Sequence, residues 1–167
     1  MELLDGLQTR RSIRTYTDRP VTREQLREII RLGTMAPSGL NNQPWRFVTI
    51  QSKETLQKLA QLTKYSHVIA KAPACIAVFI DKTAMYHEVK DHQSMGACIQ
   101  NLLLASHGMG LGGVWLGEIL KSAKEVRELC GLTDQYELMA VVSLGYPAGK
   151  GGVAERRPVE EVLLKEL

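Results

Sequence analysis

Apolar residues gather in four stretches along the chain, and their pattern predicts strands. The stretches cover residues 45–51, 73–81, 114–116 and 137–145. Within the second stretch, residues 74–80 are apolar without interruption and rich in β-branched side chains. We therefore expect that strand to be buried on both faces.

Between these stretches, apolar residues recur at helical spacing. Thr22 and Gln25 form a capping-box pair, which predicts a helix that begins after Thr22. The turn at residues 36–39 contains a proline and a glycine, and we expect it to end this helix. A second helix is expected to start near Ser52.

The longest predicted helix covers residues 91–107 and carries apolar groups on several sides. Such a helix must be covered by other elements or by a second subunit. Ser122 and Glu125 form another capping-box pair, and Gly131 is placed to close the helix that follows. The pattern indicates an α/β or α+β protein with four or five helices.

The composition excludes several classes of function. With 167 residues, 44% hydrophobic and 23% charged, the chain is expected to form one globular domain over residues 1–167. The net charge of +3 is too small and too dispersed to indicate a nucleic-acid partner. No signal peptide or apolar run of about 18 residues is visible, so we expect no membrane partner and a cytoplasmic location.

Three motifs lack the context that catalytic or metal sites need. Residues 108–113 spell GxGxxG, but they follow a predicted helix, the reverse of a dinucleotide fingerprint. His87 and His92 are too far apart to share a helix face as zinc ligands do. The three cysteines form no CxxC pair, and no GxSxG motif is present. We expect neither a metal site nor hydrolase chemistry.

Two polar segments near the start of the chain suggest a cofactor. Residues 10–14 place three arginines and a serine together, and guanidinium groups match phosphate oxygens. A solvated basic turn is the alternative, and the arginines alone leave the two interpretations equal. Residues 36–45 are rich in amides that can bind a flat heteroaromatic ring. Together the segments suggest a phosphorylated, ring-bearing cofactor.

The chain resembles the nitroreductase family of FMN-dependent oxidoreductases. The resemblance rests on RRSIRTY, APSGLNNQPW, QNLLLASHGMGLGGVWLG, VVSLGYP and RRP, which occur in the expected order over nearly the whole chain. It implies an α+β fold with a mixed, mainly antiparallel sheet flanked by helices. It also implies an intertwined homodimer with FMN at the interface.

The resemblance further implies which residues bind FMN. The phosphate and ribityl chain would be held by Arg10, Arg11, Ser12 and Arg14, with Arg156 and Arg157 returning to the phosphate. The flavin of the other subunit would be reached by Pro37, Ser38, Gly39 and Asn41. The isoalloxazine would be crossed by Leu116, Gly117 and Glu118, with a backbone N–H near its N5. Lys64 and Lys71 are candidates for the pyrimidine edge.

Two departures from the family pattern affect these expectations. The family usually carries two adjacent glycines where this chain has Gly117 and Glu118. Glu118 would either clash with a close approach of the backbone or point its carboxylate towards the substrate. The chain is also short for the family, so helices that cover the pocket in longer members are expected to be missing.

The implied activity is electron transfer from NADH or NADPH, through FMN, to a small-molecule acceptor such as a nitroaromatic or a quinone. The mechanism would be ping-pong, and no catalytic side chain is expected because the flavin carries the chemistry. A reductive dehalogenase or a flavin-dependent dehydrogenase of the same fold is one alternative. A non-catalytic basic binding module is the other.

Overall fold

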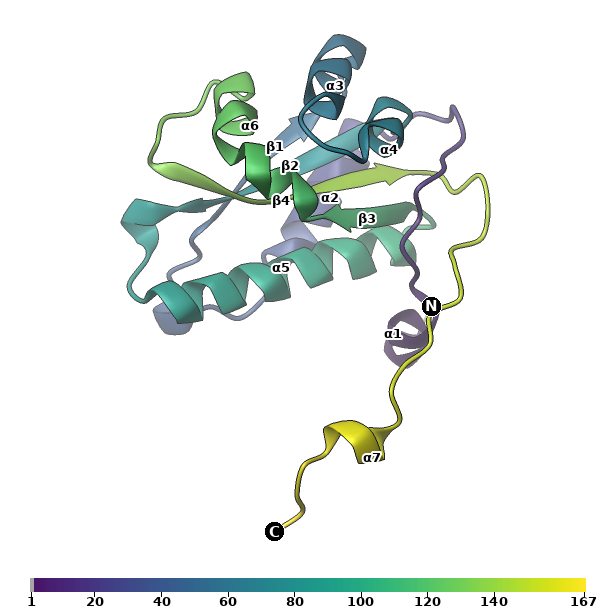
Figure 1. Cartoon of the computed structure of the whole chain (residues 1–167), viewed down its shortest axis with the longest axis vertical. Coiled ribbons are helices and arrows are strands. Elements are labelled where there is room, and N and C mark those ends of the chain that lie inside the picture. Colours follow the sequence, from purple (N-terminus) through teal and green to yellow (C-terminus); the bar gives the residue numbers. More distant parts are fainter. Residues whose placement is uncertain (1) are drawn as a thin grey trace.

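The centre of the molecule is a four-stranded sheet, seen in a computed structural model that describes residues 2–167 (Figure 1). The strands are β1 (Trp45–Ile50), β2 (Ala74–Asp81), β3 (Gly112–Leu116) and β4 (Tyr136–Gly145). They lie in the spatial order β1-β2-β4-β3, and every neighbouring pair is antiparallel. The predicted α+β class is confirmed.

Helices cover both faces of this sheet (Figure 1). One face packs against α2 (Arg23–Gly33) and α5 (Glu88–Gly108). The other packs against α3 (Lys53–Ala60), α4 (Ser66–Ala70) and α6 (Ala123–Leu129). Side chains of β2 alternate between the two layers, with Ile76 and Val78 on the first side and Cys75 and Phe79 on the second. All of β2 is buried, as its apolar run predicted.

Two predicted helix starts are confirmed by their caps. The Thr22 hydroxyl accepts a hydrogen bond from the Gln25 N–H at 3.1 Å, and the Gln25 side chain accepts one from the Thr22 N–H at 3.0 Å. The Ser52 hydroxyl likewise accepts from the Thr55 N–H at the start of α3. These contacts satisfy N–H groups that have no partner within the helix.

The capping box predicted at Ser122 and Glu125 is wrong. Ser122 is the last residue of a 3₁₀ helix, Glu118–Ser122, and its hydroxyl caps nothing. The chain therefore enters α6 from an already helical turn. The prediction for α5 is late by three residues, because His87 caps that helix and Asp91 lies inside it. Gly131 has a φ of +68° and follows α6, as expected.

The described residues form seven α-helices, more than the four or five predicted. The additional ones include α1 (Leu3–Thr9) and α7 (Val159–Val162), near the two ends of the chain. Both helices are short, and their exposed residues include Leu3, Leu7 and Val159. Short helices of this kind carry too little periodic pattern to be recognised in the sequence.

The segment from Ser12 to Thr17 crosses the end of the sheet at which β3 begins and β4 ends. Ser12 forms an isolated parallel bridge with Gly113, and the Ile13 N–H donates to the Gly113 carbonyl at 3.1 Å. Further along, the Thr17 N–H donates to the Tyr146 carbonyl at 2.9 Å. These bonds fix the arginine-rich segment against strands that are themselves held in the core.

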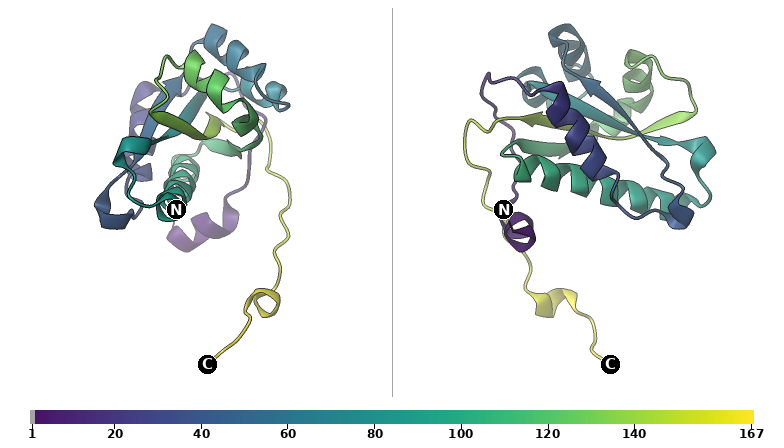
Figure 2. Two further views of the ribbon diagram at one scale, coloured as in Figure 1. Left: turned by 60° about the vertical axis from the view of Figure 1, so that its left-hand side comes forward. Right: turned by 180° about the vertical axis from the view of Figure 1, so that it is seen from behind.

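The C-terminal tail extends away from the body of the fold, whereas α1 contacts α5. In Figures 1 and 2, the residues after β4 leave the sheet and carry α7 well outside it, while α1 lies beyond α5. The tail exposes Val159, Val162, Leu163 and Leu164. No helix within residues 2–167 is long and apolar enough to cross a bilayer.

Candidate functional site

The structure gathers most of the predicted phosphate-binding residues around one cavity of about 200 Å³. Its polar lining comes from Arg10, Arg11, Ser12, Arg14 and Arg156. Although the first four residues and Arg156 are separated by nearly the whole chain, the tail brings them together. Arg157 does not line this cavity and is exposed on the tail.

The charges in this cavity are not neutralised within the chain. None of the salt bridges among residues 2–167 includes Arg10, Arg14 or Arg156. Burial, together with the charges of Arg156 and Arg11, lowers the pKa of Arg10. Burial and the charges of Arg10 and Arg11 also lower the pKa of the nearby His107. The cavity is therefore electropositive, and its guanidinium and hydroxyl donors fit a phosphate dianion.

Arg11 differs from its neighbours because its guanidinium already has acceptors. Its Nη1 donates to the carbonyls of Gln8 at 2.7 Å and Arg10 at 2.8 Å. Those carbonyls belong to the end of α1, where the helix leaves acceptors without partners. Arg11 therefore secures the turn that presents Arg10 and has fewer donors left for a ligand.

The predicted amide-rich turn lies elsewhere in the fold. Pro37, Ser38 and Gly39 line a cavity of about 400 Å³ that they share with residues of α5 and with Tyr86. None of them contributes to the arginine-lined cavity. Within one chain, the two halves of the predicted site are therefore not brought together.

The backbone of this turn has an unusual conformation. Leu40, Asn41 and Gln43 all have positive φ values, of 55°, 55° and 47°. Side chains rarely adopt this region, so the surrounding structure must hold it. The Ser38 hydroxyl contributes by accepting a hydrogen bond from the Gln43 N–H at 3.1 Å. The side chain of Asn41 is exposed.

A buried carboxylate fastens the turn to α5. The Asn42 amide donates to Asp91 Oδ1 at 2.7 Å. Asp91 Oδ2 accepts from the backbone N–H groups of Tyr86 and His87, at 2.9 Å and 2.8 Å. Burial opposes the charge on Asp91, but these hydrogen bonds outweigh it and lower the pKa of the carboxyl. This role could not be recognised in the sequence, because an aspartate near a helix start resembles an ordinary dipole-stabilising residue.

Glu118, which follows the end of β3, has several partners within the chain. Its carboxylate accepts from the Thr63 hydroxyl at 2.7 Å and from the Lys64 N–H at 3.1 Å. It also pairs with Lys121 at 2.6 Å, and Lys121 and Thr63 lower the pKa of Glu118 to about 2. The carboxylate is held by groups of the chain itself, whereas the clash and the substrate contact expected from the sequence remain predictions.

Leu116 and Gly117 precede this glutamate and have contrasting environments. Leu116 is buried in the second core layer, and Gly117 is exposed. A Cβ at Gly117 would meet nothing closer than Trp115 Nε1 at 3.9 Å. The backbone at Gly117 is therefore accessible to a ligand.

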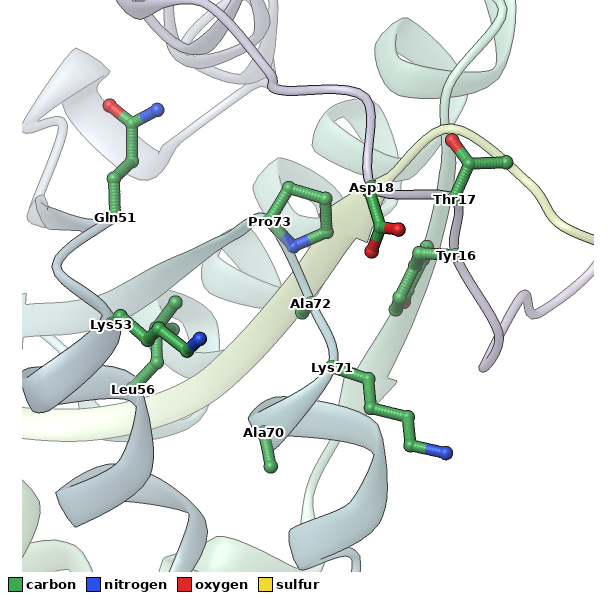
Figure 3. A pocket seen from close by; sticks show the side chains of 10 residues that line it. All are labelled: Tyr16, Thr17, Asp18, Gln51, Lys53, Leu56, Ala70, Lys71, Ala72 and Pro73. Atoms are coloured by element: carbon green, nitrogen blue, oxygen red, sulfur yellow. The ribbon is translucent and has the colours of Figure 1, made fainter.

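A further cavity of about 460 Å³ contains Lys71, one of the two lysines named as candidates (Figure 3). Its lining includes Tyr16, Ala72 and Pro73, and Lys53 and Lys71 contribute amino groups to it. It shares no lining residue with the arginine-lined cavity. Lys64, the other candidate, places its Nζ 5.5 Å from the centre of the Tyr65 ring.

Comparison with known proteins identifies the class to which this fold and site belong. The model of the nitroreductase family matches residues 7–66 and 60–146, and the chain belongs to this family. A relative from Archaeoglobus fulgidus, named as an NADH dehydrogenase/NAD(P)H nitroreductase, is 37% identical over 87% of this chain and 86% of its own. An FMN reductase [NAD(P)H] from Bacillus subtilis is 31% identical over 96% of this chain and 72% of its own.

A solved structure agrees with this assignment. The nitroreductase of Desulfovibrio desulfuricans, crystallised in complex with FMN, is 44% identical in sequence and superimposes with a TM-score of 0.95. The match covers 100% of this chain and 98% of that protein.

Proposed function

We propose that this protein is an FMN-dependent oxidoreductase that transfers electrons from NADH or NADPH to a small acceptor such as a nitroaromatic or a quinone. The observation that carries the proposal is the cavity lined by Arg10, Ser12, Arg14 and Arg156, whose arginines have no carboxylate partner among the described residues. Membership of the nitroreductase family and the FMN complex of the Desulfovibrio protein support the choice of ligand.

The residues of the chain would divide the binding of FMN among them. Arg10, Ser12, Arg14 and Arg156 would hold the phosphate by charge-assisted hydrogen bonds. The open backbone at Gly117 would lie near the ring, where an N–H stabilises added negative charge without a titrating side chain. Arg11 would act indirectly, through the α1 turn. Bound FMN would supply the two-electron chemistry, in which NAD(P)H, a proton and a quinone become NAD(P)⁺ and a hydroquinone.

We further propose that the active form is a homodimer with the flavin at the interface. The Pro37–Asn41 turn does not line the arginine cavity of its own chain, so a second copy is needed to place both around one ligand. The apolar side chains exposed on α1 and on the tail would be buried in such an interface.

One measurement tests the proposed function. The protein, purified after addition of FMN, should show the visible absorbance of a bound flavin, and NADH or NADPH should bleach it without oxygen. Addition of a quinone should restore the absorbance. A colourless protein that does not retain added FMN would refute the proposal.

A further inference from the structure

The cavity beside the Pro37–Gly39 turn has a second wall that the proposed flavin contacts do not use. This wall comes from Tyr86 and from the first turns of α5, where Lys90, Gln93 and Ser94 line it. The cavity measures about 400 Å³, which suits a small ligand. A substrate in reach of the proposed flavin contacts would therefore meet these side chains.

Tyr86 is held in place by its surroundings. A Cβ at Gly39 would overlap the Tyr86 hydroxyl, so the phenol ring occupies the space that only glycine leaves open. The backbone of Tyr86 is fixed by its hydrogen bond to the buried Asp91. Tyr86 as a whole nevertheless remains 43% exposed. A fixed and exposed ring beside the turn gives the cavity an aromatic wall.

Lys90 provides a positive charge that the chain does not neutralise. It forms no salt bridge among residues 2–167, and its Nζ lies 5.5 Å from the centre of the Tyr86 ring. Asp91, the nearest carboxylate in sequence, is buried and bonded to three other donors. Glu88 is two residues away, and side chains at that spacing do not face each other on a helix.

The position of Lys90 is unfavourable for the helix itself. It is the third residue of α5, a helix of 21 residues, and the dipole of a helix disfavours cations in the first turn. The contact of the ammonium with the Tyr86 ring offsets part of this cost. Conflicts with local rules are typical of functional sites, and a cation beside an exposed aromatic ring suits an anionic aromatic ligand.

We infer that the acceptor is a planar aromatic compound that carries an anionic group. Its ring would lie against Tyr86, and its carboxylate or similar group would meet the ammonium of Lys90. This inference deepens the proposed function and rests on it. For a nitroaromatic acid, NAD(P)H, a proton and the nitro group would become NAD(P)⁺, a nitroso group and water.

The test compares a matched pair of acceptors, 4-nitrobenzoate and 4-nitrobenzamide, which differ in charge at one end of the ring. The measured quantity is the ratio of their kcat/KM values in the FMN-loaded protein, because the ratio cancels effects on flavin binding. Lys90→Gln should lower the ratio by about tenfold, the effect of one lost charge-assisted contact. Lys90→Arg should largely restore it.

The control variant is Lys53→Gln, because Lys53 likewise forms no salt bridge among residues 2–167 but lines a different cavity, the one shown in Figure 3. It should leave the ratio unchanged. An active Lys90→Gln protein with an unchanged ratio would overturn this inference and leave the proposed function standing. A protein that reduces neither acceptor, nor a quinone, would refute the proposed function and the inference with it.

Discussion

At the scale of single residues, neighbouring side chains of one type have different tasks. Arg14 lines the electropositive cavity and forms no salt bridge among residues 2–167, whereas Arg11 donates to two backbone carbonyls. The sequence presents both as equal members of one cluster. Their roles differ because of the path that the backbone takes after α1. No local pattern in the sequence predicts that path.

Replacing Arg14 with alanine should weaken FMN binding without unfolding the protein. The lost contact to a charged phosphate is worth roughly 1.5–3 kcal/mol, which corresponds to an increase in Kd of about 10-fold to 100-fold. Titration of the apoprotein with FMN by fluorescence measures this effect. Arg23→Ala, which removes an exposed arginine from α2, serves as the control. Equal FMN affinities in the two variants would contradict the phosphate assignment.

Asp91 should contribute stability that depends on pH. Its pKa is lower in the folded state than the value of about 3.9 for a free aspartate. The ionised carboxylate therefore stabilises the fold above that pH, and this contribution is lost as the pH falls below about 4.

The variant Asp91→Asn tests this contribution. It places an amide donor beside donors that need an acceptor, and each unsatisfied group costs roughly 1–3 kcal/mol. Urea unfolding should show a large deficit against the parent at pH 7 and a smaller one at pH 3. The control Asp134→Asn, at an exposed turn residue, should show no stability deficit at either pH. A deficit that does not change with pH would contradict the assigned charge state.

At the scale of elements, the parts of the fold with strong patterns could be predicted from the sequence. The apolar run of β2 and the cap of α2 depend on neighbouring residues alone, and both predictions are confirmed. The Ser122 cap failed because the 3₁₀ helix before it depends on tertiary contacts of Glu118. The Asn42–Asp91 contact joins residues far apart in sequence, so no local pattern could reveal it.

The junction between β3 and the arginine segment gives a prediction at this scale. A Cβ at Gly112 would lie 2.5 Å from Ile13 Cγ1, in the middle of the segment that presents Ser12. Gly112→Ala should therefore displace this segment, cost roughly 1–3 kcal/mol of stability and weaken FMN binding as well. Thermal unfolding and FMN titration measure the two effects.

Gly149→Ala is the matched control, because its Cβ would lie at an ordinary 3.8 Å from Thr15 Oγ1. We expect this substitution to leave stability and FMN affinity close to those of the parent. A Gly112→Ala variant that binds FMN normally would show that the segment does not depend on this close packing.

At the scale of the whole molecule, both ends of the chain expose apolar side chains to solvent. Val162, Leu163 and Leu164 on the tail and Leu3 and Leu4 on α1 are exposed, although each belongs to an apolar residue type. Both segments are too short to give a clear periodic pattern in the sequence. Their burial is expected in the homodimer proposed above.

A double substitution in the tail, Val162→Asp with Leu163→Asp, should weaken the homodimer. Burying two charged groups in an apolar interface is unfavourable, so dissociation should appear at higher protein concentration than in the parent. Light scattering coupled to size-exclusion chromatography measures the mass. The control is the double substitution Glu160→Gln with Glu161→Gln, which changes the same helix without adding charge to its apolar side. A parent protein that is monomeric at all concentrations would contradict the dimer.

The separation of the arginine cavity from the Pro37–Asn41 turn has a consequence for genetics. In the proposed homodimer, two defective copies, one carrying Arg10→Ala and the other Gly39→Ala, would damage opposite halves of a shared site. A mixed pair of such subunits would contain one site with both defects and one with none. Cells that produce both copies should therefore regain reductase activity that neither copy provides alone, by complementation between alleles of a single gene.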